Sequence, residues 1–321
     1  MRYEKKVVIL SSVLAVLLVA WVAGFVFSPE RVAARSESAR LIAGKSADVA
    51  SISLKGSGPA AVIELEKSGS DWVLVDGSAK FPVQAARVSS FLGDLAAVSR
   101  LRTVARSKDS WAGFQLDEAQ AKRATLKDSA GKVLADIYVG GYGPTGSEIY
   151  LRRGGSDVSY TADSGLASYL GYGRSTWLDL KVLGDVKEAD VQSLSVKSSI
   201  VLDPKLKVAL ALDYPLVRSA QGWKSGAAGL DAESVSALLR SIVGLQGEDY
   251  VASPPPDAFA KVAARLALEL GNGKSLALEV GAPAGADRFY ARVAGRPLVF
   301  TVSSYSLRGC LKSLADLAPK K

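Results

Sequence analysis

An uncharged apolar run from Val7 to Phe27 opens the chain, and no comparable run recurs in its 321 residues. A helix of this length spans about 30 Å, the thickness of a bilayer's hydrocarbon core. The run therefore predicts an N-terminal transmembrane anchor. The alternative is a cleaved signal peptide, whose apolar region is usually about 7–15 residues long and ends at small residues. Ser28-Pro29-Glu30 follows the run and offers no favourable cleavage position, which favours the anchor.

Basic residues flank this run on both sides. They are Arg2, Lys5 and Lys6 before it, and Arg31, Arg35 and Arg40 after it. The positive-inside count is thus nearly balanced, but large C-terminal domains translocate largely regardless of charge. We expect the N-terminus inside the cytoplasm and the body outside the cytoplasmic membrane.

Two later segments carry apolar residues at the i, i+3, i+4, i+7 spacing of an amphipathic helix. The apolar positions are Val88, Phe91, Leu92 and Leu95 in residues 85–98, and Val235, Leu238, Leu239 and Ile242 in residues 231–245. Asp231 is expected to be the N-cap of the second helix, because its carboxylate can accept from the free amides of the first turn.

Between these helices, short β-prone segments alternate with turn residues and predict hairpins. The turns are expected around residues 128–132, 154–155, 271–274 and 294–295. The third contains Asn272-Gly273, a strong hairpin signal because both residues tolerate positive φ.

The body contains one pattern twice. Tyr150, Arg152 and Thr161 recur 140 residues later as Tyr290, Arg292 and Thr301. Strand runs with one helix inserted and one appended predict α+β repeats, in which helices pack on one face of an antiparallel sheet. The expected order is a cytoplasmic stub and anchor (1–27), a spacer (28–48), a first repeat (49–180) and a second repeat (181–318).

Composition narrows the possible chemistry. With 48% hydrophobic and 22% charged residues the body is globular in character. The chain has no histidine, which excludes Ser-His-Asp triads, HExxH zinc sites and imidazole bases. Its one cysteine, Cys310, cannot form an internal disulfide and is expected to be a buried small hydrophobe. The net charge of +8 is not gathered in a basic stripe with aromatics, so nucleic acid is not an expected partner.

Two segments have part of a binding motif without its context. Gly141 to Gly146 matches G-x-G-x-x-G, but a strand rather than a helix is expected to follow it. Asp185, Glu188 and Asp190 lack the spacing of a metal-binding loop and are expected to form a polar linker. The sequence therefore predicts no catalytic residue, cofactor or metal, and the protein is not expected to be an enzyme.

Aromatic residues that have no counterpart in the other repeat are the candidate partner surface. They are Trp111, Tyr169, Tyr172 and Trp177. An exposed aromatic patch is typical of protein contacts.

Nine segments in order carry a family resemblance. They are the anchor, the strands at residues 49–54, 62–67, 71–75 and 148–152, the turn at 114–116, the strand end at 139–140, and the mid-chain segments at 177–183 and 190–194. Together they resemble the domain-of-unknown-function 4340 family over residues 49 to about 317. The resemblance implies an envelope protein without family catalytic residues, and some relatives look like auxiliary parts of ABC-type export or gliding-motility systems.

From the anchor, the repeats and this resemblance we expect a membrane-anchored, extracytoplasmic accessory or scaffolding protein of an envelope complex, such as an ABC-type transporter. Its expected partners are the membrane, through Val7 to Phe27, and an envelope or integral membrane protein. The alternative is a binding module for a glycan, lipid or other envelope ligand, held between the two repeats.

Overall fold

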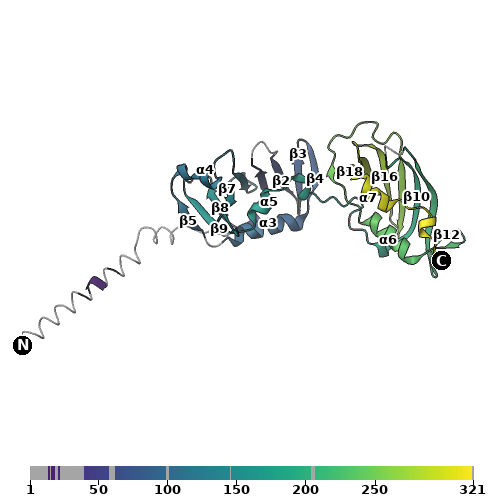
Figure 1. Cartoon of the computed structure of the whole chain (residues 1–321), viewed down its shortest axis with the longest axis horizontal. Coiled ribbons are helices and arrows are strands. Elements are labelled where there is room, and N and C mark those ends of the chain that lie inside the picture. Colours follow the sequence, from purple (N-terminus) through teal and green to yellow (C-terminus); the bar gives the residue numbers. More distant parts are fainter. Residues whose placement is uncertain are drawn as a thin grey trace, which may run out of the picture. The chain divides into compact units, whose positions relative to one another are not determined.

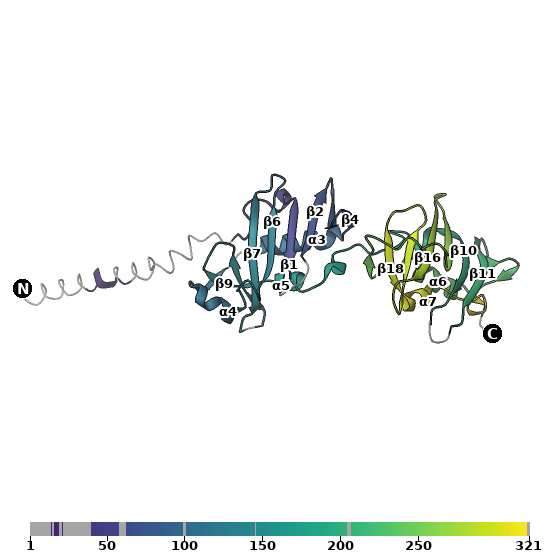
Figure 2. The same cartoon turned by 90° about the horizontal axis from the view of Figure 1, so that it is seen from above.

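The computed structural model describes residues 14, 16–18, 21, 40–57, 62–98, 101–144, 146–203 and 207–319. The chain divides into two compact units. Unit 1 comprises Met1–Trp72 and Ala85–Tyr172, and unit 2 comprises Val73–Gln84 and Gly173–Lys321. Figures 1 and 2 show the elements of each unit from two directions.

The strands of the described residues form two antiparallel sheets of nine strands each. The first has the order β4-β3-β2-β1-β6-β7-β8-β9-β5. Its strands are β1 (Ser51–Lys55), β2 (Ile63–Ser68), β3 (Asp71–Asp76), β4 (Ala79–Pro82), β5 (Arg102–Ala105), β6 (Lys122–Lys127), β7 (Val133–Tyr142), β8 (Glu148–Arg153) and β9 (Ser159–Asp163). The accompanying helices are α3 (Ala85–Ala97), α4 (Trp111–Phe114) and α5 (Leu166–Leu170).

The second sheet has the order β13-β12-β11-β10-β15-β16-β17-β18-β14. Its strands are β10 (Val191–Ile200), β11 (Leu210–Ser219), β12 (Gly222–Ser225), β13 (Ala228–Gly229), β14 (Asp249–Tyr250), β15 (Ala264–Leu270), β16 (Ser275–Pro283), β17 (Arg288–Val293) and β18 (Val299–Ser303). Its helices are α6 (Ala232–Val243) and α7 (Ser304–Cys310). Single 3-10 turns complete the described chain: η1 (Ser46–Asp48), η2 (Lys108–Ser110), η3 (Arg174–Thr176), η4 (Glu188–Asp190) and η5 (Ala315–Leu317).

The two sheets repeat one strand order, with β1 equivalent to β10 and each later strand in step. Tyr150 pairs with Thr161 between β8 and β9, and Tyr290 pairs with Thr301 between β17 and β18. The residues matched in the sequence therefore occupy equivalent positions. The predicted α+β class with antiparallel sheets is confirmed, and the similarity of the sheets indicates an internal repeat.

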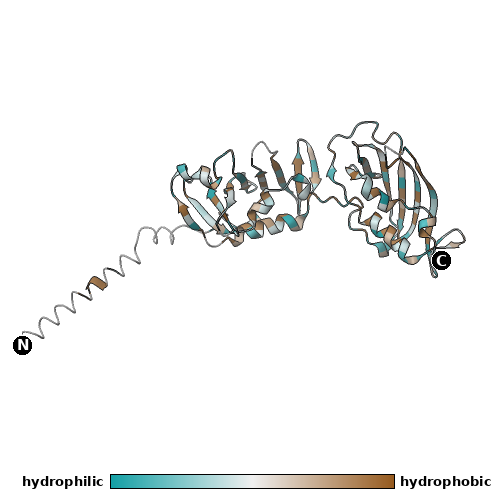
Figure 3. Ribbon diagram, in the orientation of Figure 1, coloured by the Kyte–Doolittle hydropathy of each residue, from teal (hydrophilic) through white to brown (hydrophobic). Residues whose placement is uncertain are grey.

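Apolar and polar residues are mixed along the strands (Figure 3). Strand β7 is buried on both faces, because Tyr138 packs with Leu116 and Ala121 in a cluster of its own, whereas β1 alternates. In β1, Ile52 and Leu54 are buried whereas Ser51 and Ser53 are only half-buried, as expected when successive side chains point to opposite faces. The four hairpins turn where the sequence predicts them. Glycine supplies the left-handed backbone at Gly273, whose φ is 79°.

The long helices contribute the predicted apolar faces to the cores, and Figure 1 shows α3 and α5 along the first sheet and α6 and α7 along the second. Every predicted position is buried: Val88, Phe91, Leu92 and Leu95 in α3, and Val235, Leu238, Leu239 and Ile242 in α6. Asp231 is the N-cap of α6, because its carboxylate accepts from the Ser234 amide at 2.8 Å.

Most of the predicted anchor at residues 7–27 and most of the predicted spacer lie outside the described residues. Leu14, Val16, Leu17, Leu18 and Trp21 are described, and they are helical and exposed. Among the described parts of the chain, no helix combines the length and the apolar character that crossing a bilayer requires.

The end of the predicted spacer packs on unit 1. Leu41 and Ile42 are buried, and the Ala43 amide donates to the Leu134 carbonyl of β7 at 2.7 Å. Residues 41–43 thus belong to the folded body rather than to a free linker.

Candidate functional site

Trp111 stands at the start of α4 and takes part in a cluster within unit 1. The guanidinium carbon of Arg152 lies 3.9 Å from the Trp111 ring centroid and 3.5 Å from that of Tyr138. Arg152 Nε donates to the Leu116 carbonyl at 2.9 Å, and the residue is only 2% exposed. One face of the Trp111 ring is therefore used to hold an internal arginine.

Tyr169 and Tyr172 lie elsewhere on unit 1, each with its ring 5.7 Å from the guanidinium of Arg87. The Tyr169 hydroxyl donates to Asp94 at 2.8 Å, and its ring packs edge-on against Phe91. Burial and the hydrogen bond to Asp94 raise the pKa of Tyr169. Tyr172 is 55% exposed.

The fourth predicted residue, Trp177, is fully buried and belongs to unit 2. The structure therefore brings Tyr169 and Tyr172 together around Arg87 but does not gather the four aromatic residues into one patch.

The three acidic residues of the predicted linker also have separate partners. Lys181 contacts Asp185 at 2.6 Å, Ser236 donates to Glu188 at 2.5 Å, and Asp190 accepts from the Lys187 amide.

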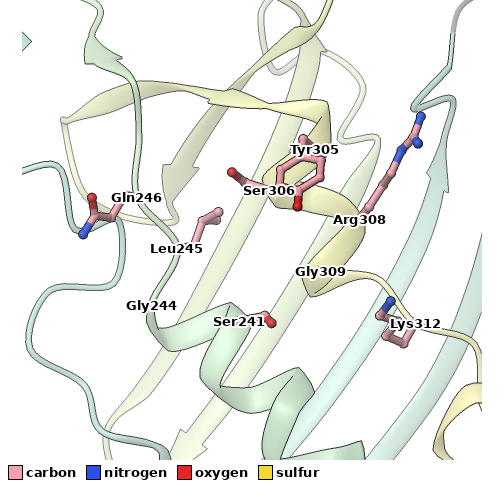
Figure 4. Close-up of a pocket in the computed structure, with 9 residues that line it drawn as sticks. All are labelled: Ser241, Gly244, Leu245, Gln246, Tyr305, Ser306, Arg308, Gly309 and Lys312. Atoms are coloured by element: carbon pink, nitrogen blue, oxygen red, sulfur yellow. The ribbon is translucent and has the colours of Figure 1, made fainter.

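A groove of about 660 Å³ lies in unit 2, where the end of α6 meets α7 (Figure 4). We refer to it as the α6–α7 groove. The residues that line it are Ser241, Gly244, Leu245, Gln246, Tyr305, Ser306, Arg308, Gly309 and Lys312. Figure 4 shows Ser241, Gly244 and Leu245 on the α6 side and Tyr305, Ser306, Arg308 and Gly309 on the α7 side.

In the first repeat Tyr169 joins the two corresponding helices, through its contacts with Asp94 and Phe91 of α3. The buried pair Leu166/Leu170 of α5 matches Leu307/Leu311 at the end of α7, which makes Tyr169 equivalent to Cys310. The apolar faces of the long helices match in the same way, which makes Asp94 equivalent to Ser241. The bond from Tyr169 to Asp94 thus has a smaller counterpart, in which Cys310 Sγ donates to the Ser241 carbonyl at 3.3 Å.

The residues at these helices also differ in charge between the two repeats. Arg308 and Lys312 stand where the first repeat has Ala167 and Gly171, and Ser241 replaces the carboxylate of Asp94. Neither cation forms an ion pair with any described residue. The groove residues include no carboxylate. Hydrogen bonds from the Ser313 hydroxyl and amide lower the pKa of Asp316, and the charge of Lys312 lowers it further.

The groove therefore offers two cations, hydroxyl groups and one largely exposed aromatic ring, that of Tyr305, which is 85% exposed. Arginine and lysine bind carboxylate or phosphate oxygens by charge-assisted hydrogen bonds. No lining carboxylate could act as a general base. The chemistry that these residues support is recognition of an anionic group.

Cys310 is buried in α7, where its thiol donates to the carbonyl of the groove residue Ser241, and it is expected to be unreactive in the folded protein. Burial raises the pKa of the Cys310 thiol to about 12, so at pH 8 about one thiol in ten thousand is the nucleophilic thiolate. We expect maleimide labelling at pH 8 to be at least about 100-fold slower in buffer than in 6 M urea, because unfolding restores both access and the ordinary pKa.

Cys310 is the one cysteine of the chain, so the labelled fraction reports on it alone. The raised pKa also means that the folded state holds the thiol proton more tightly. This contribution to stability is complete below about pH 9 and is lost as pH rises toward 12. Equal labelling rates with and without urea would show that the thiol is not buried.

Two tandem α+β repeats, each built on a nine-stranded antiparallel sheet, define the class of this protein. Residues 72–262 match the model of the family described as domain of unknown function (DUF4340), and the chain belongs to that family. The match is shorter than the resemblance drawn from the sequence, since it begins in β3 and ends before β15. No curated protein and no solved structure matches the chain.

The sequence did not predict the α6–α7 groove. Its two cations lie beyond the residues that match the family model. A signal for it was present. Aligning the closing helices on their Leu-x-x-x-Leu spacing places Cys310 against Tyr169, and Arg308 and Lys312 against uncharged residues. The site follows from residues that differ between the two repeats, whereas the repeat itself is recognised from the residues that they share.

Proposed function

We propose that this protein is a membrane-anchored, extracytoplasmic accessory or scaffolding subunit of an envelope complex, such as an ABC-type transporter, and that it acts by binding rather than by catalysis. The observation that carries the proposal is the divergence of the two repeats. In the first repeat Tyr169 of the short helix bonds to Asp94 of the long one, and in the second repeat the corresponding helices border a groove lined by Arg308 and Lys312. A duplicated domain whose copies differ at this place suits a subunit that presents a contact site.

The N-terminal residues support the membrane part of this proposal. The apolar run Val7 to Phe27 has the length of a bilayer span, and its described residues expose apolar side chains on a helix. Leu41 and Ile42 are buried on unit 1, which leaves residues 28–40 to connect the anchor to the body. A short connection of this kind would keep unit 1 near the membrane surface.

The second candidate function is an extracytoplasmic binding module for a glycan, lipid or other envelope ligand. The α6–α7 groove favours it as far as binding is concerned, because it supplies polar groups beside an apolar and aromatic lining. Its open form favours contact with a larger partner, since sites for small ligands bury most of the ligand's surface. We therefore place the accessory function first.

Fractionation and protease access test the proposed function. In spheroplasts, the full-length chain should sediment with membranes and its body should be digested by added protease. Mild cross-linking followed by detergent extraction should then recover integral membrane proteins with it. A matched control replaces Val7 to Phe27 with a cleavable signal peptide and should release the body as a soluble protein. Protection of the body from protease would contradict the orientation, and recovery of the chain alone would contradict the accessory function.

A further inference from the structure

We propose that the α6–α7 groove is the docking site for an extended, acidic polypeptide segment of a partner protein. The proposal rests on the accessory function proposed above, and it adds the place and the chemistry of the contact. Three features of the groove carry it: the lining residues that differ from the first repeat, its positive charge, and its shape.

The groove differs from the first repeat in side chains and in the length of its short helix, since α7 begins at Ser304 and so includes Tyr305 and Ser306. Both repeats place a short helix against the long one, and both join the two helices at the same position, by Tyr169 in one copy and Cys310 in the other. The tyrosine and the carboxylate of the first repeat are thus replaced by a cysteine and by Ser241, which are smaller. These lining residues are therefore specific to the second repeat.

The residues that line this groove include two cations and no carboxylate, and Arg308 and Lys312 form no ion pair with a described residue. In the first repeat the corresponding cations are Arg87, beside the Tyr169 ring, and Lys122, whose Nζ donates to the Ala167 carbonyl. An incoming carboxylate would gain charge-assisted hydrogen bonds from these cations. A complementary partner is thus acidic.

The shape favours a polypeptide over a small anion. The groove is open to solvent along α7 and is lined by Leu245 and by the exposed ring of Tyr305 as well as by the cations. Tyrosine and arginine are the residues that most often dominate the energy of protein–protein contacts. An isolated phosphate would use the cations but leave Tyr305 and Leu245 without a role, whereas a peptide chain can cover all four side chains.

The first test measures binding of a fluorescein-labelled dodecapeptide of alternating glutamate and serine to the purified full-length protein. Versions with glutamine or lysine in place of glutamate serve as probe controls. We expect the acidic peptide alone to bind, and we expect R308A/K312A to weaken its Kd at least about tenfold, as loss of charge-assisted contacts implies. The matched variant K224A/K274A removes two exposed lysines from strand β12 and a hairpin turn and should leave the Kd unchanged.

The second test fills the groove with the residues of the first repeat. S241D/C310Y should abolish binding of the acidic peptide, and circular dichroism will show whether the variant folds. If it does not fold, R308A/K312A still decides the question, since both of its residues lie at the surface of the groove. Equal binding by the wild type and R308A/K312A would overturn the proposal, as would equal binding of the three peptides.

Two further probes separate the other sources of negative charge. Tight binding of inorganic phosphate, or of phosphatidylglycerol vesicles, that is lost in R308A/K312A while the peptide fails to bind would assign the groove to a small anion or to lipid and refute the proposal. These measurements use the purified protein and no membrane partner. A failed cross-linking experiment would therefore contradict the accessory function without changing the peptide result.

Discussion

Alanine at Gly281 is expected to lower the free energy of unfolding of unit 2 by about 3 kcal/mol or more, the largest effect of any single methyl group that the structure suggests. A Cβ at this position in β16 would lie 2.0 Å from the carbonyl oxygen of Ala258. That oxygen is fixed, because it accepts from the Ala282 amide at 2.8 Å. The loop and the strand would have to separate, which breaks this hydrogen bond and opens the edge of the core.

Gly140 occupies the equivalent position of the first repeat, where a Cβ would lie 2.2 Å from the Phe114 carbonyl oxygen. We expect G140A to destabilise unit 1 to a similar extent. Urea unfolding of the full-length protein, followed by tryptophan fluorescence, measures both effects. The matched control is G93A, which adds a methyl group in α3 with nothing within 4 Å. It should be neutral or stabilising by up to about 1 kcal/mol. Tolerance of G281A at wild-type stability would show that the loop does not contact the strand.

The second large effect is expected from R152A, which should destabilise unit 1 by about 3–4 kcal/mol. The guanidinium of Arg152 is enclosed by the rings of Trp111 and Tyr138 and donates to the Leu116 carbonyl. Its removal leaves a cavity between the rings and an unsatisfied buried carbonyl, and it ends two cation–π contacts. The same urea titration measures the loss.

Arg292 provides the internal control, because it is the equivalent residue of the second repeat in a different setting. Its side chain is 37% exposed, and its main partner, Glu279, also pairs with Arg265. We therefore expect R292A to cost about 1–2 kcal/mol, less than R152A. R152K should be intermediate, because lysine keeps the charge but not the flat shape that fits between two rings. If R152A and R292A lower the free energy of unfolding by the same amount, the enclosure of Arg152 between two rings contributes nothing to stability.

Much of the fold could be predicted because its signals are local. Helical spacing identified both buried helix faces, and Asn272-Gly273 and the paired glycines located the hairpins. The recurrence of Tyr150, Arg152 and Thr161 revealed the repeat. A stronger repeat signal was available in Ala47–Lys55 and Ala189–Lys197, which share Ala-Asp-Val, two serines and a lysine in the same spacing and form equivalent strands, β1 and β10.

The strand order and the candidate site were harder to predict. The pairing of β1 with β6 joins strands that lie on either side of α3, and no local pattern specifies it. Trp177 shows why the exposed residues of a site are hard to predict from the sequence. An aromatic residue without a counterpart in the other repeat looks the same in the sequence whether it is buried or exposed. The groove depends on where α7 begins and on how α6 and α7 meet, and no local sequence pattern specifies that arrangement.

The central position of β1 and β10 has a consequence for how the chain folds as it emerges N-terminus first. Each is paired on one side by its neighbour in sequence, β2 or β11, and on the other by β6 or β15, which are made only after a long helix and an outer strand. Until then the half-made sheet has a free edge at its centre, and such distant pairings form slowly. With one cysteine, no internal disulfide can hold the halves together in the meantime. Each repeat is therefore most vulnerable to misassociation midway through its own synthesis, when a holding chaperone would be most useful.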